Sequence, residues 1–359
     1  MTALVQSAIT IVIFVVMLGV LVVIHELGHF VTARRAGVRV HEFGIGFPPR
    51  AKVMRSRGET LYTLNWLPLG GFVRLEGEDG DSDDPRSFVR ASMPRKLTIL
   101  IAGVAMNLAL AFLIFFLIAW LASPTWRLTI NDVHPDSPAA AAGLVVGDHV
   151  ETIEGDDFDG FGDPGRVLRE RAGQTVQLGV VRADGTRAIV QATLRRPEDI
   201  TPASGALGIR FAGHVDYVQN SPAEAAKIAV VRTGQALTLI WSGLGQLVDS
   251  IVNHPTEAPP AAGPLGIASQ VGQVFWQLGP IYTLYLAGLL SANLALFNIL
   301  PLPPFDGGRI AIILLKSVAG ERVSIRAERL TYLVGFVFLM VFVAWISYFD
   351  IQRFLGGGS

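Results

Sequence analysis

The feature that most constrains this chain is the sequence HELGH, residues 25–29, at the end of an uncharged apolar stretch. An HExxH motif on a helix places two imidazoles at i and i+4 on one face, where both can bind one zinc ion. His25 and His29 are therefore predicted zinc ligands, and Glu26 beside them is the predicted general base that activates water. The apolar stretch before the motif indicates that this helix lies in a membrane.

The composition is that of a membrane protein. Of the 359 residues, 51% are hydrophobic and 16% are charged, whereas about a quarter of the residues in a soluble domain are charged. The net charge of −1 gives no reason to expect a nucleic acid partner. The chain has no cysteine, which excludes disulfides, cysteine-ligated zinc and cysteine nucleophiles.

Four apolar stretches are long enough to cross the hydrocarbon core, which takes about 20 helical residues. They are residues 8–31, 97–123, 279–300 and 330–349. The first has no basic n-region and no cleavage site, so we expect a retained span and not a signal peptide. Residues 233–248 are uncharged but short, and we expect an amphipathic or interfacial helix there. The final residues, 356–359, resemble a linker remnant and are left out of the fold.

Basic residues near the span ends predict the orientation. They are Arg34, Arg35, Arg39, Arg90, Arg95, Lys96, Arg309, Lys316, Arg322, Arg326 and Arg329. Loops 32–96 and 306–329 should therefore face the cytoplasm, and residues 124–278 and both termini should lie outside. This orientation places HELGH at the cytoplasmic end of the first span.

A zinc hydrolase needs a third protein ligand and one open position for water. Asp306, in the sequence PLPPFDGG, lies just past the third span and at the same cytoplasmic depth as HELGH. A fifth span at residues 233–248 would move Asp306 to the opposite face. A carboxylate near the membrane interior is unfavourable unless it is paired or binds a metal. Asp306 is therefore the predicted third ligand, and one zinc ion is the predicted cofactor.

The other histidines fit a metal site less well. His41 and its neighbour Glu42 lie in the cytoplasmic loop, where we expect a strand. The remaining four lie in the external part, and these are His134, His149, His214 and His254. Surface or structural roles are expected for all of them.

Residues 61–78 could hold an extended substrate, which peptide hydrolysis requires because a helix uses its carbonyls in its own hydrogen bonds. Two strand-like runs flank Pro68 and the following glycines, which predicts a β-hairpin. The hairpin could re-enter the membrane and present a strand edge, and an ordinary cytoplasmic hairpin is the alternative. The residues of this segment that are predicted to contact the substrate are Gly70, Gly71, Phe72 and Val73.

Polar and proline residues in or next to the second and third spans are further candidate substrate contacts. Pro301 and Pro303 end the third span and impose extended geometry. Asn298 could hydrogen-bond the substrate or an oxyanion, or it could cap the helix end. In the second span, Gly103 and Asn107 are spaced GxxxN, so the glycine permits close helix approach and Asn107 could hydrogen-bond towards the active site.

Residues 126–211 contain short strands separated by Gly, Asp and Pro. The sequence SPAAAAGLVVGD, residues 137–148, resembles a PDZ domain, and GALGI resembles the peptide-binding strand of a circularly permuted bacterial PDZ domain. PDZ domains bind an extended peptide at a sheet edge. The predicted peptide contacts are Gly205, Leu207, Gly208 and Ile209. A β-rich domain that only filters substrates by size is the alternative.

HELGHF, GVAMN, PLGGFVRLEGE, the permuted PDZ sequence and NILPLPPFDGG together resemble the bacterial site-2 proteases over nearly the whole chain. These are zinc intramembrane metalloproteases, and the resemblance is greatest to the regulator-of-sigma-E protease type. It implies that His25, His29 and Asp306 bind zinc, that Glu26 is the base and that Asn298 positions the substrate. GPLGI, residues 263–267, resembles a family motif and could form a gate or clamp with a nearby helix.

Two departures from the family pattern are visible. One PDZ module is recognisable where some relatives carry two in tandem, so filtering of substrates by size could be looser. The zinc motif has FDGG where many relatives have LDGG, and Phe305 should not disturb coordination.

The predicted fold is a polytopic α-helical membrane protein with four transmembrane helices, a re-entrant β-hairpin and an extracytoplasmic PDZ-like β-rich domain. The predicted parts are a catalytic core in two segments, a PDZ domain and a clamp region. Their residues are 1–123 and 279–355 for the core, 124–212 for the PDZ domain and 213–278 for the clamp region.

The resemblance implies an intramembrane endopeptidase of the bacterial inner membrane that is surrounded by lipid. We expect a monomer. Its substrates would be single-span proteins such as anti-sigma factors or remnant signal peptides. A non-catalytic PDZ-bearing scaffold without zinc is one alternative. A membrane zinc protease that cuts soluble-domain or prenylated substrates is another.

Overall fold

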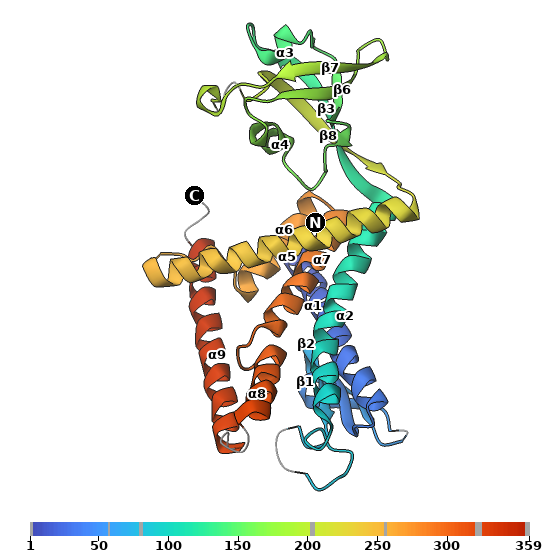
Figure 1. Cartoon of the computed structure of the whole chain (residues 1–359), viewed down its shortest axis with the longest axis vertical. Helices are drawn as coiled ribbons and strands as arrows, with labels where there is room; N and C mark the ends of the chain where they lie inside the picture. The colour runs from blue at the N-terminus through green and yellow to red at the C-terminus, as the bar shows by residue number, and fades with distance from the viewer. Residues whose placement is uncertain are drawn as a thin grey trace. The chain divides into compact units, whose positions relative to one another are not determined.

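The computed structural model describes residues 3–56, 58–78, 82–201, 205–254, 257–319 and 325–355. The chain forms two compact units. The first, here called the membrane unit, comprises residues 1–116 and 227–359, and the second, the β-rich unit, comprises residues 117–226. Figure 1 shows both units along the chain.

Four helices of the described chain are long and apolar enough to cross a membrane, as the sequence predicts. They are α1 (Ala3–Arg35), α2 (Met93–Ala122), α7 (Pro280–Ile299) and α9 (Ile325–Leu355). Protein buries only 6% of the most apolar window of α1 and 11% of that of α9. Lipid must cover the remaining apolar surface, so this is an integral membrane protein.

Three further helices complete the membrane unit: α5 (Pro222–Asn253), α6 (Pro264–Gln277) and α8 (Asp306–Ala319). Helix α5 contains the uncharged residues 233–248 and is not among the four candidate spans. It runs across the spans in Figure 1, and its Ala229 and Ala236 pack in one cluster with Phe115 and Ala292. The predicted helix is therefore present, and its place at the membrane interface stays a prediction.

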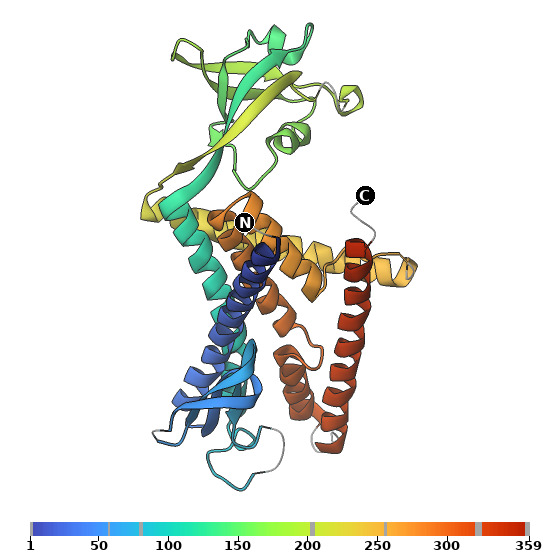
Figure 2. The ribbon, with the colours of Figure 1, turned by 180° about the vertical axis from the view of Figure 1, so that it is seen from behind.

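Strands β1 (Val40–Arg55) and β2 (Leu61–Leu75) form an antiparallel sheet beside α1 (Figure 2). Glu42 of β1 pairs with both Leu61 and Arg74 of β2. The two arms of β2 therefore flank the first part of β1, residues 40–45, and the first arm also pairs with the second part of β1. The arms do not pair with each other, so the hairpin predicted within residues 61–78 is wrong. No other strand of the described residues pairs with the second arm, Gly71–Leu75, which forms an edge.

The β-rich unit contains a six-stranded sheet in the order β7-β6-β4-β3-β8, with β5 paired to β4. The strands are β3 (Ser123–Val133), β4 (His149–Ile153), β5 (Asp156–Asp157), β6 (Thr175–Val181), β7 (Arg187–Thr193) and β8 (Ile209–Val218). Short helices are α3 (Pro138–Ala141), α4 (Pro164–Glu170) and the 3-10 turn η1 (Pro197–Asp199). Leu128, Ile130 and Leu178 lie in its apolar core, and β8 pairs with β3 on one side and forms an edge of the sheet.

The segment 137–148 forms a helical turn and a loop that leads into β4. Ser137 caps α3, because its hydroxyl accepts the N–H of Ala140 at 3.2 Å. Asp148 is fully buried and accepts hydrogen bonds from the N–H of Val145 and from the guanidinium of Arg182 at 3.0 and 2.6 Å. The buried carboxylate is therefore paired and stabilises the loop.

Candidate metal centre and catalytic pocket

Three side chains from two helices converge on one point. His25 and His29 project from one face of α1, and Asp306 is the first residue of α8. The Nε2 atoms of the two histidines lie 3.1 Å apart. Asp306 Oδ2 lies 3.1 Å from His25 Nε2 and 3.2 Å from His29 Nε2. Within the described residues, this is the one group of three or more side chains that could hold a metal ion.

These distances fit zinc. Tetrahedral zinc with bonds of about 2.0–2.2 Å holds its ligand atoms about 3.3–3.6 Å from one another. The three separations of 3.1–3.2 Å lie just below this range, so small shifts of the side chains would admit the ion. In addition, Asp306 Oδ2 is buried without a hydrogen-bond partner among the described residues, and such an oxygen is stable only beside positive charge.

The second ring nitrogen of His29 fixes its orientation. His29 Nδ1 lies 2.9 Å from the carbonyl oxygen of Ile99 on α2. Nδ1 therefore carries the ring proton, and the Nδ1–H group donates a hydrogen bond to this carbonyl. The lone pair of Nε2 is then directed at the metal position.

His25 has Asn107 as its second partner. His25 Nδ1 lies 3.4 Å from Asn107 Nδ2, and Asn107 Oδ1 is buried without a partner among the described residues. If His25 Nε2 binds a metal, Nδ1 carries a proton and needs an acceptor. A 180° turn of the Asn107 amide places Oδ1 opposite Nδ1 and satisfies both groups. Asn107 thus lies beside a candidate metal ligand, and its predicted contact with substrate stays a prediction.

Two glycines let α1 and α2 approach at the metal centre. A Cβ atom on Gly28 would lie 2.4 Å from the carbonyl oxygen of Ala102. A Cβ atom on Gly103 would lie 2.4 Å from His29 Nε2 and 2.7 Å from His25 Cε1. Any larger residue at position 103 would displace the candidate ligands, which explains the glycine of the GxxxN sequence.

A pocket of about 260 Å³ opens beside the three candidate ligands. Glu26 lines it, and so do three of the predicted substrate contacts: Phe72, Val73 and Asn298. Gly71 lies just behind, where a Cβ atom would be 3.6 Å from Glu26 Cγ. Glu26, the strand edge and the candidate ligands therefore share one cavity.

The other five predicted substrate contacts are not among the residues that line this pocket, and these are Gly71, Asn107, Gly70, Pro301 and Pro303. Gly70 has a φ of +100° and lies against the ring of Phe47 in the bend of β2. Pro301 is exposed just past the end of α7. The backbone of Pro303 packs against Gly335 of α9, where a Cβ atom would lie 2.5 Å from the Pro303 carbonyl oxygen. The two prolines thus lie in the segment between α7 and α8, and Asn298 but neither proline lines the pocket.

Glu78 and Arg309 also line the pocket and form an ion pair there, a contact that no sequence pattern predicts. Arg309 was noted only as a basic residue near a span end. The carbonyl of Ile99 was also missed, because a backbone atom leaves no mark in the sequence. Of the other ligand candidates, His41 pairs with Glu76 and Glu42 pairs with Arg50.

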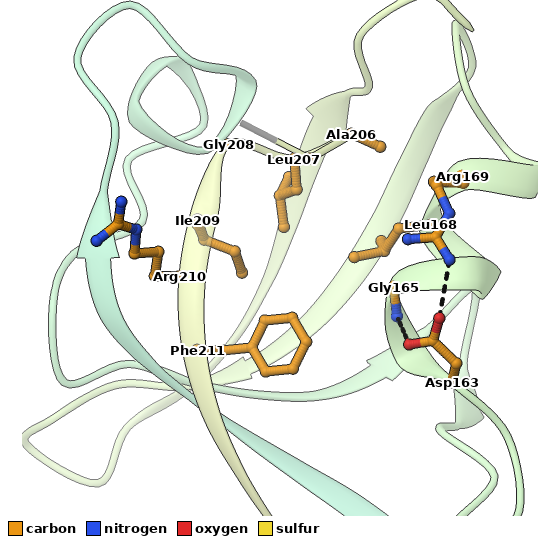
Figure 3. A pocket seen from close by; sticks show the side chains of 11 residues that line it. Asp163, Gly165, Leu168, Arg169, Ala206, Leu207, Gly208, Ile209, Arg210 and Phe211 are labelled. Carbon is orange, nitrogen blue, oxygen red and sulfur yellow. Dashed lines mark hydrogen bonds and ion pairs between the residues drawn. The ribbon is translucent and has the colours of Figure 1, made fainter. Parts of the chain in front are cut away.

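The β-rich unit has a pocket of about 390 Å³ lined by residues of α4 and β8, and all four predicted peptide contacts line it. These contacts are Gly205, Leu207, Gly208 and Ile209. Figure 3 shows Leu168, Leu207 and Phe211 directed into this space.

The 206–209 loop is held to the rest of the β-rich unit through its backbone carbonyls. The carbonyls of Ala206, Leu207 and Gly208 accept hydrogen bonds of 3.0 Å from backbone N–H groups elsewhere in the unit. In a planar trans peptide the N–H points opposite to the carbonyl. The N–H groups of the next residues therefore point away from these bonds, where they could bind a peptide strand or carboxylate.

Comparison with known proteins gives consistent matches. The sequence profile of the family described as Peptidase family M50 matches residues 13–342. The zinc metalloprotease RasP of Geobacillus kaustophilus is 26% identical over 98% of this chain and 99% of that protein. A Brucella suis protein provisionally named as a zinc metalloprotease is 29% identical over 95% of each chain. A Nostoc protein named in the same way is 31% identical over 91% of each chain.

Proposed function

This chain belongs to peptidase family M50 and is a zinc metalloprotease of the membrane, and from that premise we propose that it hydrolyses peptide bonds within single-pass membrane proteins. The observation that carries the proposal is the position of His25, Glu26 and His29 on α1, a candidate membrane span. Their pocket also contains Asp306. Membership of a protease family disfavours the alternative of a non-catalytic scaffold.

In the proposed reaction, His25, His29 and Asp306 hold the zinc ion. When bound, zinc supplies Lewis acidity that polarises the scissile carbonyl and lowers the pKa of an attacking water molecule. Glu26 accepts a proton from this water as the new C–O bond forms, and it then gives the proton to the amine nitrogen as the C–N bond breaks. Asn298, half-buried in the pocket wall, hydrogen-bonds the substrate backbone or the developing oxyanion.

The second arm of β2 holds the substrate. A transmembrane helix must unwind before its carbonyls can be attacked, and an unwound segment needs new hydrogen-bond partners. The outer edge of Gly71–Leu75 carries no strand within the described chain. A substrate added to this edge as a strand passes Phe72 and Val73, which share the pocket with Glu26.

The β-rich unit acts as a permuted PDZ domain in this proposal. Its loop Gly205–Ile209 and the edge of β8 bind an extended peptide or a free C-terminus outside the cytoplasm. The catalytic pocket lies toward the cytoplasmic side of the bacterial inner membrane. Substrates are anti-sigma factors or remnant signal peptides, whose cleavage releases a fragment into the cytoplasm.

The test is the variant Glu26→Gln in the full-length protein in detergent. Its zinc content should stay unchanged, because Glu26 is not a ligand. Cleavage of a single-span substrate should fall by about 10²–10⁴-fold, the usual contribution of a general base. Glu59→Gln, an exposed residue of the cytoplasmic loop, is the matched control. Cleavage that survives unchanged in Glu26→Gln refutes the mechanism.

A further inference from the structure

An ion pair joins the end of the β2 edge to the helix that carries Asp306. Glu78, three residues past the end of β2, accepts a hydrogen bond from the Arg309 guanidinium with Oε1. With Oε2 it accepts the backbone N–H of Leu75 at 3.2 Å. The Glu78 carboxylate therefore contacts both the last residue of β2, Leu75, and Arg309 on α8. It joins two elements that are far apart in the sequence.

Arg309 is held on two further sides. It lies three residues after Asp306, on the first turn of the same helix. Its guanidinium lies over the ring of Tyr332 on α9, 5.6 Å from the ring centre. Arg309 thus connects three elements: the substrate edge, the helix of a candidate metal ligand and the last span.

The pair is shielded from water. The side chains of Arg309 and Glu78 are 26% and 19% exposed, whereas the surface pair of Arg86 and Glu59 is 47% and 51% exposed. Burial lowers the pKa of Arg309, but the Glu78 charge more than compensates, so the pKa of Arg309 lies above its usual value. Arg309 therefore stays charged, and an ion pair that is shielded from water resists separation more than a surface pair does.

We propose that Glu78 and Arg309 are positioning residues that keep the β2 edge in register with the metal centre, and thereby decide which substrate bond is cut. The proposal rests on the function proposed above, in which the substrate adds to this edge. Successive residues of an added strand lie about 3.3 Å apart. A misplacement of about 1 Å can cost about 10²-fold in rate. If the ion pair did not hold the β2 edge in place, cleavage would therefore be slower and would occur at several neighbouring peptide bonds.

The experiment uses the full-length zinc-loaded protein and the variants Glu78→Gln, Arg309→Met and the combination of both. Each single variant should lower kcat for a single-span substrate by about 10²-fold and leave KM within about 3-fold, because binding to the edge persists. Mass spectrometry of the products should find additional cut sites. The double variant should be no slower than either single variant, because both remove the same contact.

Matched controls separate positioning from general damage. Glu59→Gln with Arg86→Met removes the exposed pair and should change neither rate nor cut sites. Arg309→Lys keeps the charge and should recover most of the single cut site. Zinc content should stay equal in all variants. Loss of zinc, additive effects in the double variant, an unshifted cut site or a rise in KM alone would each overturn the proposal.

A second measurement tests the inference without cleavage. The chain has no cysteine, so cysteines introduced at the exposed positions Arg74 and Leu315 are the only sites for spin labels. The distance distribution between β2 and α8 should be narrow in the parent protein and broad in Arg309→Met. An equally narrow distribution in both proteins refutes the positioning role, whatever the outcome for proteolysis. Unchanged cleavage in Glu26→Gln refutes only the proposed proteolytic mechanism.

Discussion

Replacing Gly103 with alanine should remove zinc from the protein although the added group is a single methyl. Gly103 lies on α2 opposite both candidate histidine ligands. The new Cβ would lie 2.4 Å from His29 Nε2 and 2.7 Å from His25 Cε1. Unbonded carbon and nitrogen atoms approach to about 3.5 Å, so the methyl group or the imidazole must move by about 1 Å.

The magnitude follows from the tolerance of a metal site. Zinc–ligand distances are held within about 0.2 Å of their usual values. A displacement of about 1 Å therefore detaches His29 or changes the helix crossing. His29 donates a hydrogen bond to the carbonyl of Ile99, which lies on α2 as Gly103 does, so the His29 ring has little freedom to turn away. The disturbance of an outer partner alone costs about 10–100-fold in metal affinity, so we expect a loss of at least about 10²-fold, or about 2.7 kcal/mol.

The assay is zinc retention against a graded chelator, followed by metal analysis of the purified protein. Gly234→Ala on α5 is the matched control, because nothing lies within 4 Å of its added Cβ. Alanine is favoured over glycine in a helix by about 1 kcal/mol, so the control should fold at least as well as the parent. Full zinc retention in Gly103→Ala, with the parent cleavage rate, would refute this account of the metal centre.

Two further predictions concern buried polar contacts. Asn107→Leu should weaken zinc retention by about 10–100-fold, because His25 loses its acceptor, whereas Asn107→Asp should retain zinc. Equal retention in both variants would contradict the proposed role of the amide. Asp350 accepts the N–H groups of Gly263 and Gly266 at 3.2 and 2.8 Å, so Asp350→Ala should lose about 1–3 kcal/mol and lower the thermal midpoint in detergent. An unchanged midpoint would contradict that estimate.

The sequence predicted the spans and the grouping of HELGH with Asp306 because both follow from one-dimensional signals. Apolar stretches show their length directly, and basic residues indicate which end of each span faces the cytoplasm. Depth in the membrane then restricts which distant residues can meet. The three candidate ligands come together in the structure as that argument requires.

Strand partners carry no such signal. The two arms of β2 were predicted to pair with each other because they flank Pro68 and glycines, but each pairs with β1 instead. Alternation of side chains shows that a strand exists and which face is buried, and it does not show which strand lies beside it. For the same reason, the contact between Glu78 and Arg309, 231 residues apart, could not be predicted from one sequence.

The glycines near the metal centre have a common physical cause. Lipid chains are as apolar as the helices, so helix association in a membrane depends on close packing and not on the exclusion of water. A Cβ atom on Gly307 would lie 2.2 Å from the carbonyl oxygen of Ile299, and one on Gly308 would lie 2.8 Å from the backbone of Leu302. The start of α8 therefore folds directly onto the end of α7, which brings Asp306 back to the histidines of α1. The two glycines of FDGG and the glycine of HELGH thus serve the same purpose, which is to let backbones approach until three ligand atoms lie within reach of one ion.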